Sequence, residues 1–151
     1  TINGIEARER GYDEAIFLNL EGRIAEGPGE NICIIKDGVL QANSKSESIL
    51  EGITRTSLLE IAPDLGLKTL VAPITKEDLF NADEAFFCGT AAEISPMTKV
   101  ADMSENPENP PLYTIGTGKP GILTLKLAEA YKEVTTGKNP KYEKWLAFVN
   151  E

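Results

Sequence analysis

The sequence predicts an α+β domain in which a mixed sheet, arranged as a pseudo-barrel, is surrounded by helices. Segments that predict strands mostly precede segments that predict helices, but hairpin signals lie between them. Hairpins join antiparallel strands, so this order does not suit a doubly wound parallel sheet. With 151 residues, 41% of them hydrophobic, the chain is long enough to bury a proper core. We therefore treat residues 1–151 as a single domain.

Six short runs predict strands because they are rich in apolar and β-branched residues and are bounded by turn residues. They cover residues 15–20, 23–26, 31–36, 39–42, 67–72 and 84–88. Asp37-Gly38 is the strongest hairpin signal in the chain, since a two-residue type I′ turn favours this pair. We therefore expect the runs 31–36 and 39–42 to form a hairpin.

Four segments predict helices, and residues 1–10 resemble the end of a fifth. The four cover residues 54–62, 75–79, 122–135 and 142–149. Pro63 limits the first of them, because proline is costly inside a helix. Thr75 is a candidate N-cap for the second. Residues 43–48 and 103–112 are polar or proline-rich and predict surface loops.

The charge balance argues against nucleic acids and anionic membrane surfaces as partners. The net charge is −9, and the Lys and Arg residues are scattered along the chain. No apolar run approaches the length of a membrane span, and no signal-type segment opens the chain. We expect a cytoplasmic protein that binds small molecules.

The two cysteines predict buried, reduced thiols and no metal site. Cys33 and Cys88 each lie in an apolar run of the strand type, where a free cysteine behaves as a small hydrophobic residue. The sequence has no CxxC pair and no histidine to complete a set of metal ligands. The lack of histidine also removes the commonest general base and favours covalent or cofactor chemistry.

Two Gly-Thr corners could bind an anion. Gly52-Ile53-Thr54 lies where a loop becomes a helix, and free N–H groups with the Thr54 hydroxyl would suit a phosphate there. Gly89-Thr90-Ala91 follows a buried strand, a position that often carries function. Each pattern alone is more typical of a helix cap or a turn. The sequence leaves open whether the two corners converge.

Glu26 is a candidate partner for a ring nitrogen. It follows the apolar Ile24-Ala25 and precedes the turn Gly27-Pro28-Gly29. A carboxylate held there could keep a proton on a pyridine nitrogen through a charge-assisted hydrogen bond. Alone, the residue is more typical of a solvent-facing glutamate at a strand end. The Gly-Pro-Gly run is not a dinucleotide-binding fingerprint, because GxGxxG is incomplete and no helix follows.

Five motifs in order resemble the branched-chain amino acid aminotransferases, which are pyridoxal-phosphate enzymes of the D-amino-acid-aminotransferase-like fold (fold type IV). The motifs are GYDEAIFLN, EGPGENICIIKDG, ILEGITR, ADEAFFCGTAAEISP and IGTGKPG. The resemblance spans nearly the whole chain. The ADE…GTAAE segment and the later KNPKYEKWLAFV favour the branched-chain branch over its relatives.

The resemblance implies a role for each residue of a cofactor site. Glu26 would pair with the pyridine nitrogen, and Leu50 would pack against the ring. The N–H groups of Ile53 and Thr54, with the Thr54 hydroxyl, would hold the phosphate. Thr90 would add a further phosphate contact.

The resemblance also implies what lies beyond this site. The backbone of Ala91 and Ala92 would lie near the substrate carboxylate. The Schiff-base lysine and a small N-terminal domain would precede Thr1, so no catalytic residue is assigned within 1–151. We expect a large C-terminal cofactor-binding domain that is inactive alone and belongs to a homodimer or higher homo-oligomer. Residues 43–47 and 104–112 depart from the family pattern in their loops.

The implied reaction moves the amino group of leucine, isoleucine or valine to 2-oxoglutarate. Two alternatives stay open. One is another activity of the same fold, aminodeoxychorismate lyase or D-amino acid aminotransferase. The other is a non-catalytic, cofactor-free binding domain that keeps the fold.

Overall fold

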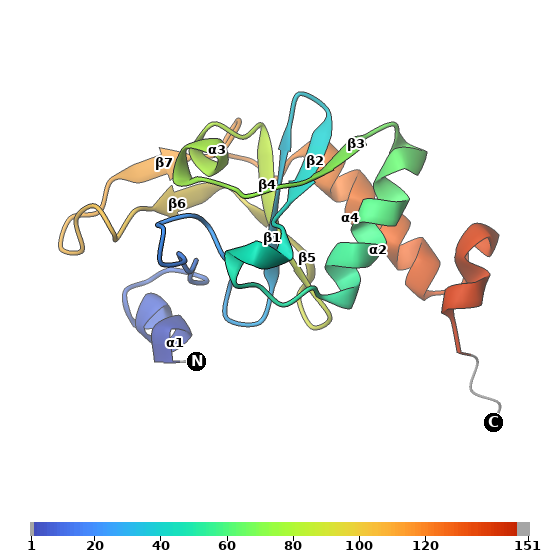
Figure 1. Ribbon diagram of the computed structural model, residues 1–151, viewed down its shortest axis with the longest axis horizontal. Coiled ribbons are helices and arrows are strands. Elements are labelled where there is room, and N and C mark those ends of the chain that lie inside the picture. Colours follow the sequence, from blue (N-terminus) through green and yellow to red (C-terminus); the bar gives the residue numbers. More distant parts are fainter. Residues whose placement is uncertain (1, 148–151) are drawn as a thin grey trace.

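A five-stranded mixed sheet is the frame of the domain (Figure 1). The computed structural model describes residues 2–147. The strands are β1 (Asn31–Lys36), β2 (Val39–Ala42), β3 (Lys68–Val71), β4 (Glu84–Gly89) and β5 (Glu93–Met97), in the spatial order β3-β2-β1-β4-β5. Only β2 and β3 pair in parallel, and the other three neighbouring pairs are antiparallel. The predicted α+β class with a mixed sheet is therefore confirmed.

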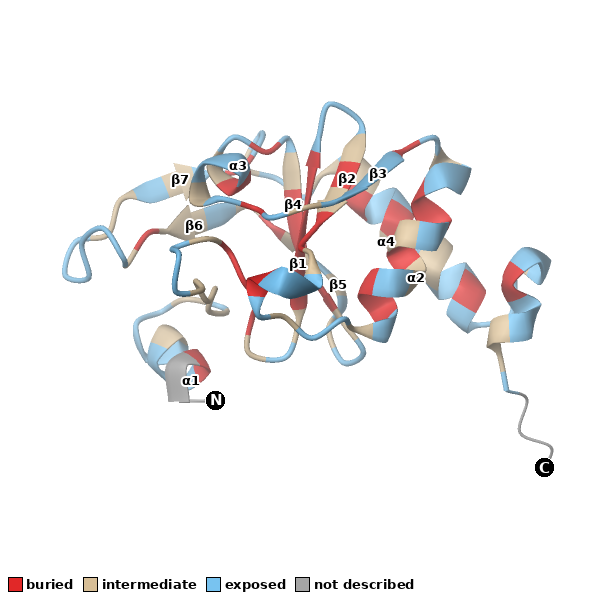
Figure 2. Cartoon of the chain, in the orientation of Figure 1, coloured by how far each residue is buried: buried red, intermediate tan, exposed pale blue. Residues whose placement is uncertain are grey.

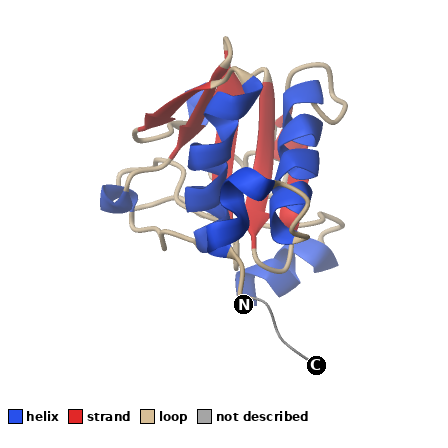
Figure 3. Cartoon of the chain, turned by 90° about the vertical axis from the view of Figure 1, so that its right-hand side faces the viewer, coloured by secondary structure: helices blue, strands red, loops and turns tan. Residues whose placement is uncertain are grey.

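Four α-helices accompany the sheet within the described residues. They are α1 (Ile2–Glu9), α2 (Ile53–Ile61), α3 (Lys76–Phe80) and α4 (Ile122–Thr135). Helices α2 and α4 lie side by side on one face of the sheet (Figures 1 and 3). A separate hairpin, β6 (Lys99–Ala101) with β7 (Leu112–Thr114), extends beyond the sheet. None of these helices has the length and apolar character needed to cross a membrane.

Strand β1 is buried on both faces, which explains its continuous apolar run. Successive side chains of a strand point to opposite faces of the sheet. Cys33 and Ile35 join the cluster beneath α2 and α4, whereas Ile32 and Ile34 join the cluster on the opposite face. Figure 2 shows burial concentrated on β1, β4 and the inner sides of these helices.

The local turn and cap predictions are confirmed. Asp37 and Gly38 have φ values of 50° and 74°, the left-handed conformation that a type I′ hairpin turn needs. Thr75 caps α3 in a capping box with Asp78. Helix α4 has the predicted bounds.

The predicted strands over residues 15–20 and 23–26 are wrong. Only isolated bridges form there, at Leu18 with Ile24 and at Glu26 with Asn31. Ile24 also bridges to Ile74, so the segment changes partner after single contacts and never builds a ladder. The chain is extended locally, but its hydrogen bonds are divided among different neighbours.

The predicted closing helix over residues 142–149 is also wrong where the structure describes it. Pro140–Trp145 forms a 3-10 helix that Asn139 caps, and Leu146 is already extended. The Tyr142 hydroxyl donates to the Asp64 carboxylate at 2.8 Å, so side-chain contacts hold this segment. Residues 148 and 149 lie outside the described part of the chain. The strands β5, β6 and β7 were not predicted.

Both cysteines are buried and free, with their Sγ atoms 3.9 Å apart on neighbouring strands. The contact with the Cys88 thiol, together with burial, raises the pKa of the Cys33 thiol. A protonated thiol without solvent access is a poor nucleophile. This pair therefore fills the core.

Substitution of Glu84 tests how α4 is fixed to the sheet. The Glu84 carboxylate accepts hydrogen bonds from the N–H groups of Leu123 and Thr124 and from the Thr124 hydroxyl, at 3.0, 2.7 and 2.7 Å. We expect Glu84→Gln to lower the free energy of unfolding by about 1–3 kcal/mol, because bonds to a charged acceptor are lost. Urea unfolding measures this, with the exposed Glu129→Gln on the same helix as control. An equal effect of the two changes would contradict the role of Glu84.

Candidate functional site

Three loops meet at one end of the sheet, where β1 begins, β4 ends and α2 begins (Figure 1). Asn31 pairs with Cys88, which places the turn over residues 26–31 beside Gly89. A Cβ atom on Gly89 would lie only 3.0 Å from the carbonyl oxygen of Gly29. Two motifs that are far apart in the sequence are therefore in direct contact.

The third motif is attached to the same place by the side chain of Asn31. Its Nδ2 donates to the carbonyl oxygen of Leu50 at 2.6 Å, and its Oδ1 accepts from the N–H of Gly52 at 3.2 Å. Asn31 is buried at the start of β1. The loop that leads into α2 is therefore fixed to the centre of the sheet.

Glu26 lies at this end with its carboxylate directed to the same loop. Its Oε2 accepts a hydrogen bond from the N–H of Leu50 at 3.0 Å, while its carbonyl oxygen accepts from Phe17 at 2.9 Å. A carboxylate has about four acceptor positions. One backbone donor leaves capacity for a protonated ring nitrogen.

The start of α2 offers backbone donors to an anion. Gly52 is its N-cap and provides no side-chain cap, so the N–H groups of the first turn have no partner within the helix. The positive end of the helix dipole adds to their attraction for an anion. Leu50 and Ile53 are 75% and 79% exposed, so they present apolar surface beside these donors.

The Thr54 side chain does not cap α2. It is buried, and its Oγ1 lies 3.2 Å from the Tyr131 hydroxyl on α4. The interpretation of Thr54 as an ordinary helix cap is therefore wrong. A tyrosine hydroxyl that donates to Thr54 leaves the threonine proton available for another acceptor.

Thr90, Ala91 and Ala92 form the turn between β4 and β5, at the same end of the sheet. Thr90 and Ala91 are exposed, and Ala92 is partly buried. Their position follows from Gly89, which contacts the turn carrying Glu26. The structure thus gathers all the sequence-predicted site residues at one end.

Glu30, in the same turn as Glu26, has an enclosed side-chain oxygen that the sequence did not indicate. Its Oε2 is enclosed and has no hydrogen-bond partner among residues 2–147. Burial, and then the negative charge of Glu14, raise the pKa of the Glu30 carboxyl, while Arg8 opposes the shift. A second acidic residue in the EGPGEN turn was the available signal, but a sequence does not show that it becomes enclosed.

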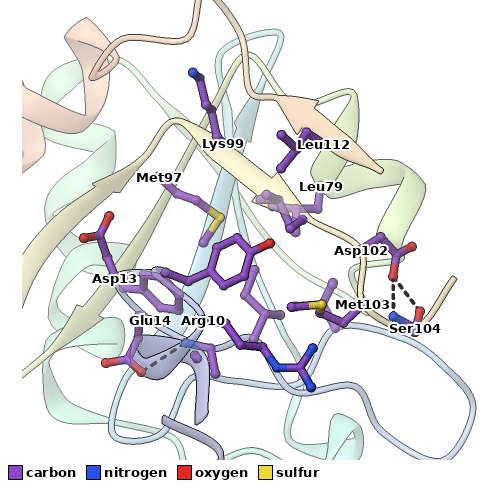
Figure 4. Close-up of a pocket in the computed structure, with 18 of the residues that line it drawn as sticks. Arg10, Asp13, Glu14, Leu79, Met97, Lys99, Asp102, Met103, Ser104 and Leu112 are labelled. Atoms are coloured by element: carbon purple, nitrogen blue, oxygen red, sulfur yellow. Dashed lines mark hydrogen bonds between the residues drawn. The ribbon is translucent and has the colours of Figure 1, made fainter. Parts of the chain in front are cut away.

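A hollow of about 1000 Å³ lies elsewhere, between α1, the β6–β7 hairpin and the edge of the sheet (Figure 4). Its apolar lining includes Leu79, Met97, Met103 and Leu112, and its charged lining includes Arg10, Asp13, Glu14, Lys99 and Asp102. The residues predicted to bind cofactor or substrate do not line it. The hollow is therefore distinct from the three-loop site, by which we mean the loops that carry Glu26, residues 50–54 and residues 90–92.

Comparison with known proteins identifies the family. Residues 3–100 match the model of the class IV aminotransferases, and the chain belongs to this family. It is 40% identical to a probable branched-chain-amino-acid aminotransferase of Synechocystis sp., covering 93% of this chain and 42% of that protein. It is 37% identical to the branched-chain-amino-acid aminotransferase of Escherichia coli strain K12, covering 98% and 45% respectively.

Solved structures show the same fold. The T.th. branched-chain amino acid aminotransferase complexed with N-(5'-phosphopyridoxyl)-L-glutamate matches with a TM-score of 0.87 and 42% identity. The match covers 99% of this chain and 46% of that one. The enzyme from Thermoproteus uzoniensis with norvaline matches with a TM-score of 0.83 and 46% identity, over 97% of this chain and 45% of that one. The chain thus spans less than half the length of these relatives.

The enclosed carboxyl of Glu30 predicts a pH-dependent stability. Folding raises the pKa of the Glu30 carboxyl, so its protonated form favours the folded state. This contribution to the free energy of unfolding is fully present below the unfolded-state pKa and is lost as pH rises through the folded-state pKa. We expect Glu30→Gln to gain stability over the wild type as pH rises from about 4 to about 7. Urea unfolding at a series of pH values measures the difference, with the exposed Glu108→Gln as control. A constant difference across this range would contradict the enclosed carboxyl.

Proposed function

We propose that this chain is the cofactor-binding domain of a branched-chain aminotransferase, which uses pyridoxal phosphate to move the amino group of leucine, isoleucine or valine to 2-oxoglutarate. The convergence of the three loops at one end of the sheet is the observation that carries this proposal. Family membership and the branched-chain relatives support it. Two solved structures of one relative contain a phosphopyridoxyl compound and pyridoxamine 5'-phosphate, respectively.

The donor set suits pyridoxal phosphate. Glu26 keeps an acceptor position for a protonated ring nitrogen, and the first turn of α2 offers uncapped N–H groups for a phosphate. Opposite charges are therefore matched at the two ends of one flat ligand. When bound, this cofactor supplies an electron sink for reactions at the α-carbon of an amino acid.

Each residue predicted to bind the cofactor has a defined task in this proposal. Glu26 holds a proton on the ring nitrogen. The N–H groups of Ile53 and Thr54, with the hydroxyls of Thr54 and Thr90, bind the phosphate. Leu50 packs on the ring and excludes water from it.

The substrate side of the site is formed by the turn after β4. The backbone of Ala91 and Ala92 orients the substrate carboxylate there. These two residues adjoin Thr90 in the chain, so the hydroxyl that binds the phosphate lies next to the backbone groups that bind the substrate.

Transamination also needs a lysine that binds the cofactor covalently, and we propose that the complete protein supplies it from outside residues 1–151 and separately carries a small N-terminal domain. The relatives are more than twice as long as this chain, which is consistent with such a domain. We propose that this domain covers the hollow beside α1, which has both apolar and charged lining residues. On this proposal residues 1–151 alone bind cofactor without catalysis, and the complete enzyme is a cytoplasmic homodimer or higher homo-oligomer.

Titration with pyridoxal phosphate tests the proposed site on the 151-residue chain. We expect spectral changes that saturate, and a dissociation constant about tenfold larger for Thr90→Ala, which loses a hydrogen bond to a charged group. The matched control is Thr117→Ala, because Thr117 lies in an exposed turn. Its neighbours Ile115 and Gly116 contact Thr98 and Asp83, which are not residues of the proposed site. Negligible binding by the wild type would favour the cofactor-free binding domain instead.

The reaction is decided by a substrate panel on the polypeptide that the complete gene encodes. Turnover of leucine that depends on 2-oxoglutarate supports the proposal. Release of pyruvate from aminodeoxychorismate, or a requirement for D-amino acids, would replace it with another activity of the same fold.

A further inference from the structure

The Asn31 side chain binds both ends of one short loop. It donates to the carbonyl oxygen of Leu50 and accepts from the N–H of Gly52, two residues later. The same Gly52 N–H lies 2.9 Å from the Leu50 carbonyl oxygen, so the loop is closed on itself as well. Between these contacts stands Glu51, after which α2 begins at Ile53.

Burial and backbone pairing fix the position of Asn31 in the site. It is buried at the first position of β1, pairs with Cys88 across the sheet, and forms a bridge with Glu26. Glu26 in turn accepts a hydrogen bond from the Leu50 N–H. Asn31 therefore contacts the backbone of Glu26 on one side and the start of α2 on the other.

We propose that Asn31 is a positioning residue that fixes the separation between the Glu26 carboxylate and the first turn of α2. The inference rests on the proposed function, in which one ligand spans these two points. It predicts that Asn31 controls the affinity for a ligand carrying both a ring nitrogen and a phosphate, and has little effect on a ligand that carries only one of them.

The physical reason is the cost of ordering two subsites relative to each other. When the spacing is fixed, the second contact of a two-ended ligand forms at a high effective concentration. When the loop is loose, binding must order it first, and this cost falls only on ligands that need both ends. A ligand with only a ring nitrogen or only a phosphate binds a single subsite, wherever that subsite lies, and so does not bear this cost.

Gly52 is the counterpart of Asn31 in this arrangement. A Cβ atom at this position would lie 2.6 Å from the Asn31 Oδ1, closer than any ordinary contact allows. Gly52→Ala would therefore displace the Asn31 amide and disturb the same spacing. If the two residues act through one contact, Asn31→Ala removes the clash, and the double variant is no worse than either single variant.

The experiment measures affinity for three probes: pyridoxamine 5'-phosphate, pyridoxamine and inorganic phosphate. The proteins are the 151-residue wild type, Asn31→Ala, Gly52→Ala and the double variant, each assayed by calorimetry well below its melting temperature. For Asn31→Ala we expect about a tenfold or greater loss for pyridoxamine phosphate, but changes within about twofold for the two one-ended probes. The double variant should match the single variants within about threefold.

Thr124→Val is the control for stability, because it removes a buried hydroxyl hydrogen bond to Glu84, at the opposite end of β4. It should lower the melting temperature without changing any of the three affinities. Equal weakening of all three probes by Asn31→Ala, or independent losses that multiply in the double variant, would overturn the positioning role. If the wild type binds pyridoxamine phosphate and the Asn31 and Gly52 variants bind it equally well, this inference alone is overturned. No binding of pyridoxamine phosphate by the wild type would overturn both the proposed function and this inference.

Discussion

The antiparallel pairing of β1 with β4 is the constraint on which the site depends. Residues 31–35 pair with residues 84–88 in one continuous register, and this register sets which loops lie together. The start of β1 carries the turn with Glu26, while the end of β4 leads to Thr90. A shift of one residue would send every side chain of β1 to the opposite face of the sheet. Because β1 is buried on both faces, the core resists such a shift.

Beyond the sheet, hydrogen bonds from polar side chains hold the backbone in place. The segment before Glu26 has no strand ladder, and Asn43 holds it by donating to the carbonyl oxygens of Ile24 and Ala25 at 2.8 and 2.9 Å. Arg55, buried in the first turn of α2, donates to the Asn43 carbonyl oxygen. These buried groups are costly to leave unpaired, so their network holds the segment before Glu26 and the start of α2 in a defined relation. Local donors would also allow a chain with net charge −9 to bind the phosphate of the proposed cofactor.

Features encoded by neighbouring residues could be predicted, whereas those that depend on distant contacts could not. The Asp37-Gly38 turn, the Thr75 cap and helix α4 follow from local conformational preferences, and the structure has all three. The short strands β5 to β7 owe their pairing to tertiary contacts, and β5 contains Pro96 at an edge of the sheet. The resemblance to a family indicated Glu26 and Thr90 as site residues. It did not indicate the enclosed Glu30 or the side-chain contacts of Asn31, because both arise from the folded arrangement.

If three loops from separate parts of the chain form one ligand site, a single ligand must affect all of them at once. Backbone amide chemical shifts of the 151-residue chain, recorded during addition of pyridoxamine 5'-phosphate, test this most directly. We expect the amides of Ile53, Thr54 and Thr90 to shift together with one dissociation constant, while that of Gly137, beyond the end of α4, stays in place. Shifts confined to residues that line the hollow, such as Met97 and Met103, would contradict a shared three-loop site.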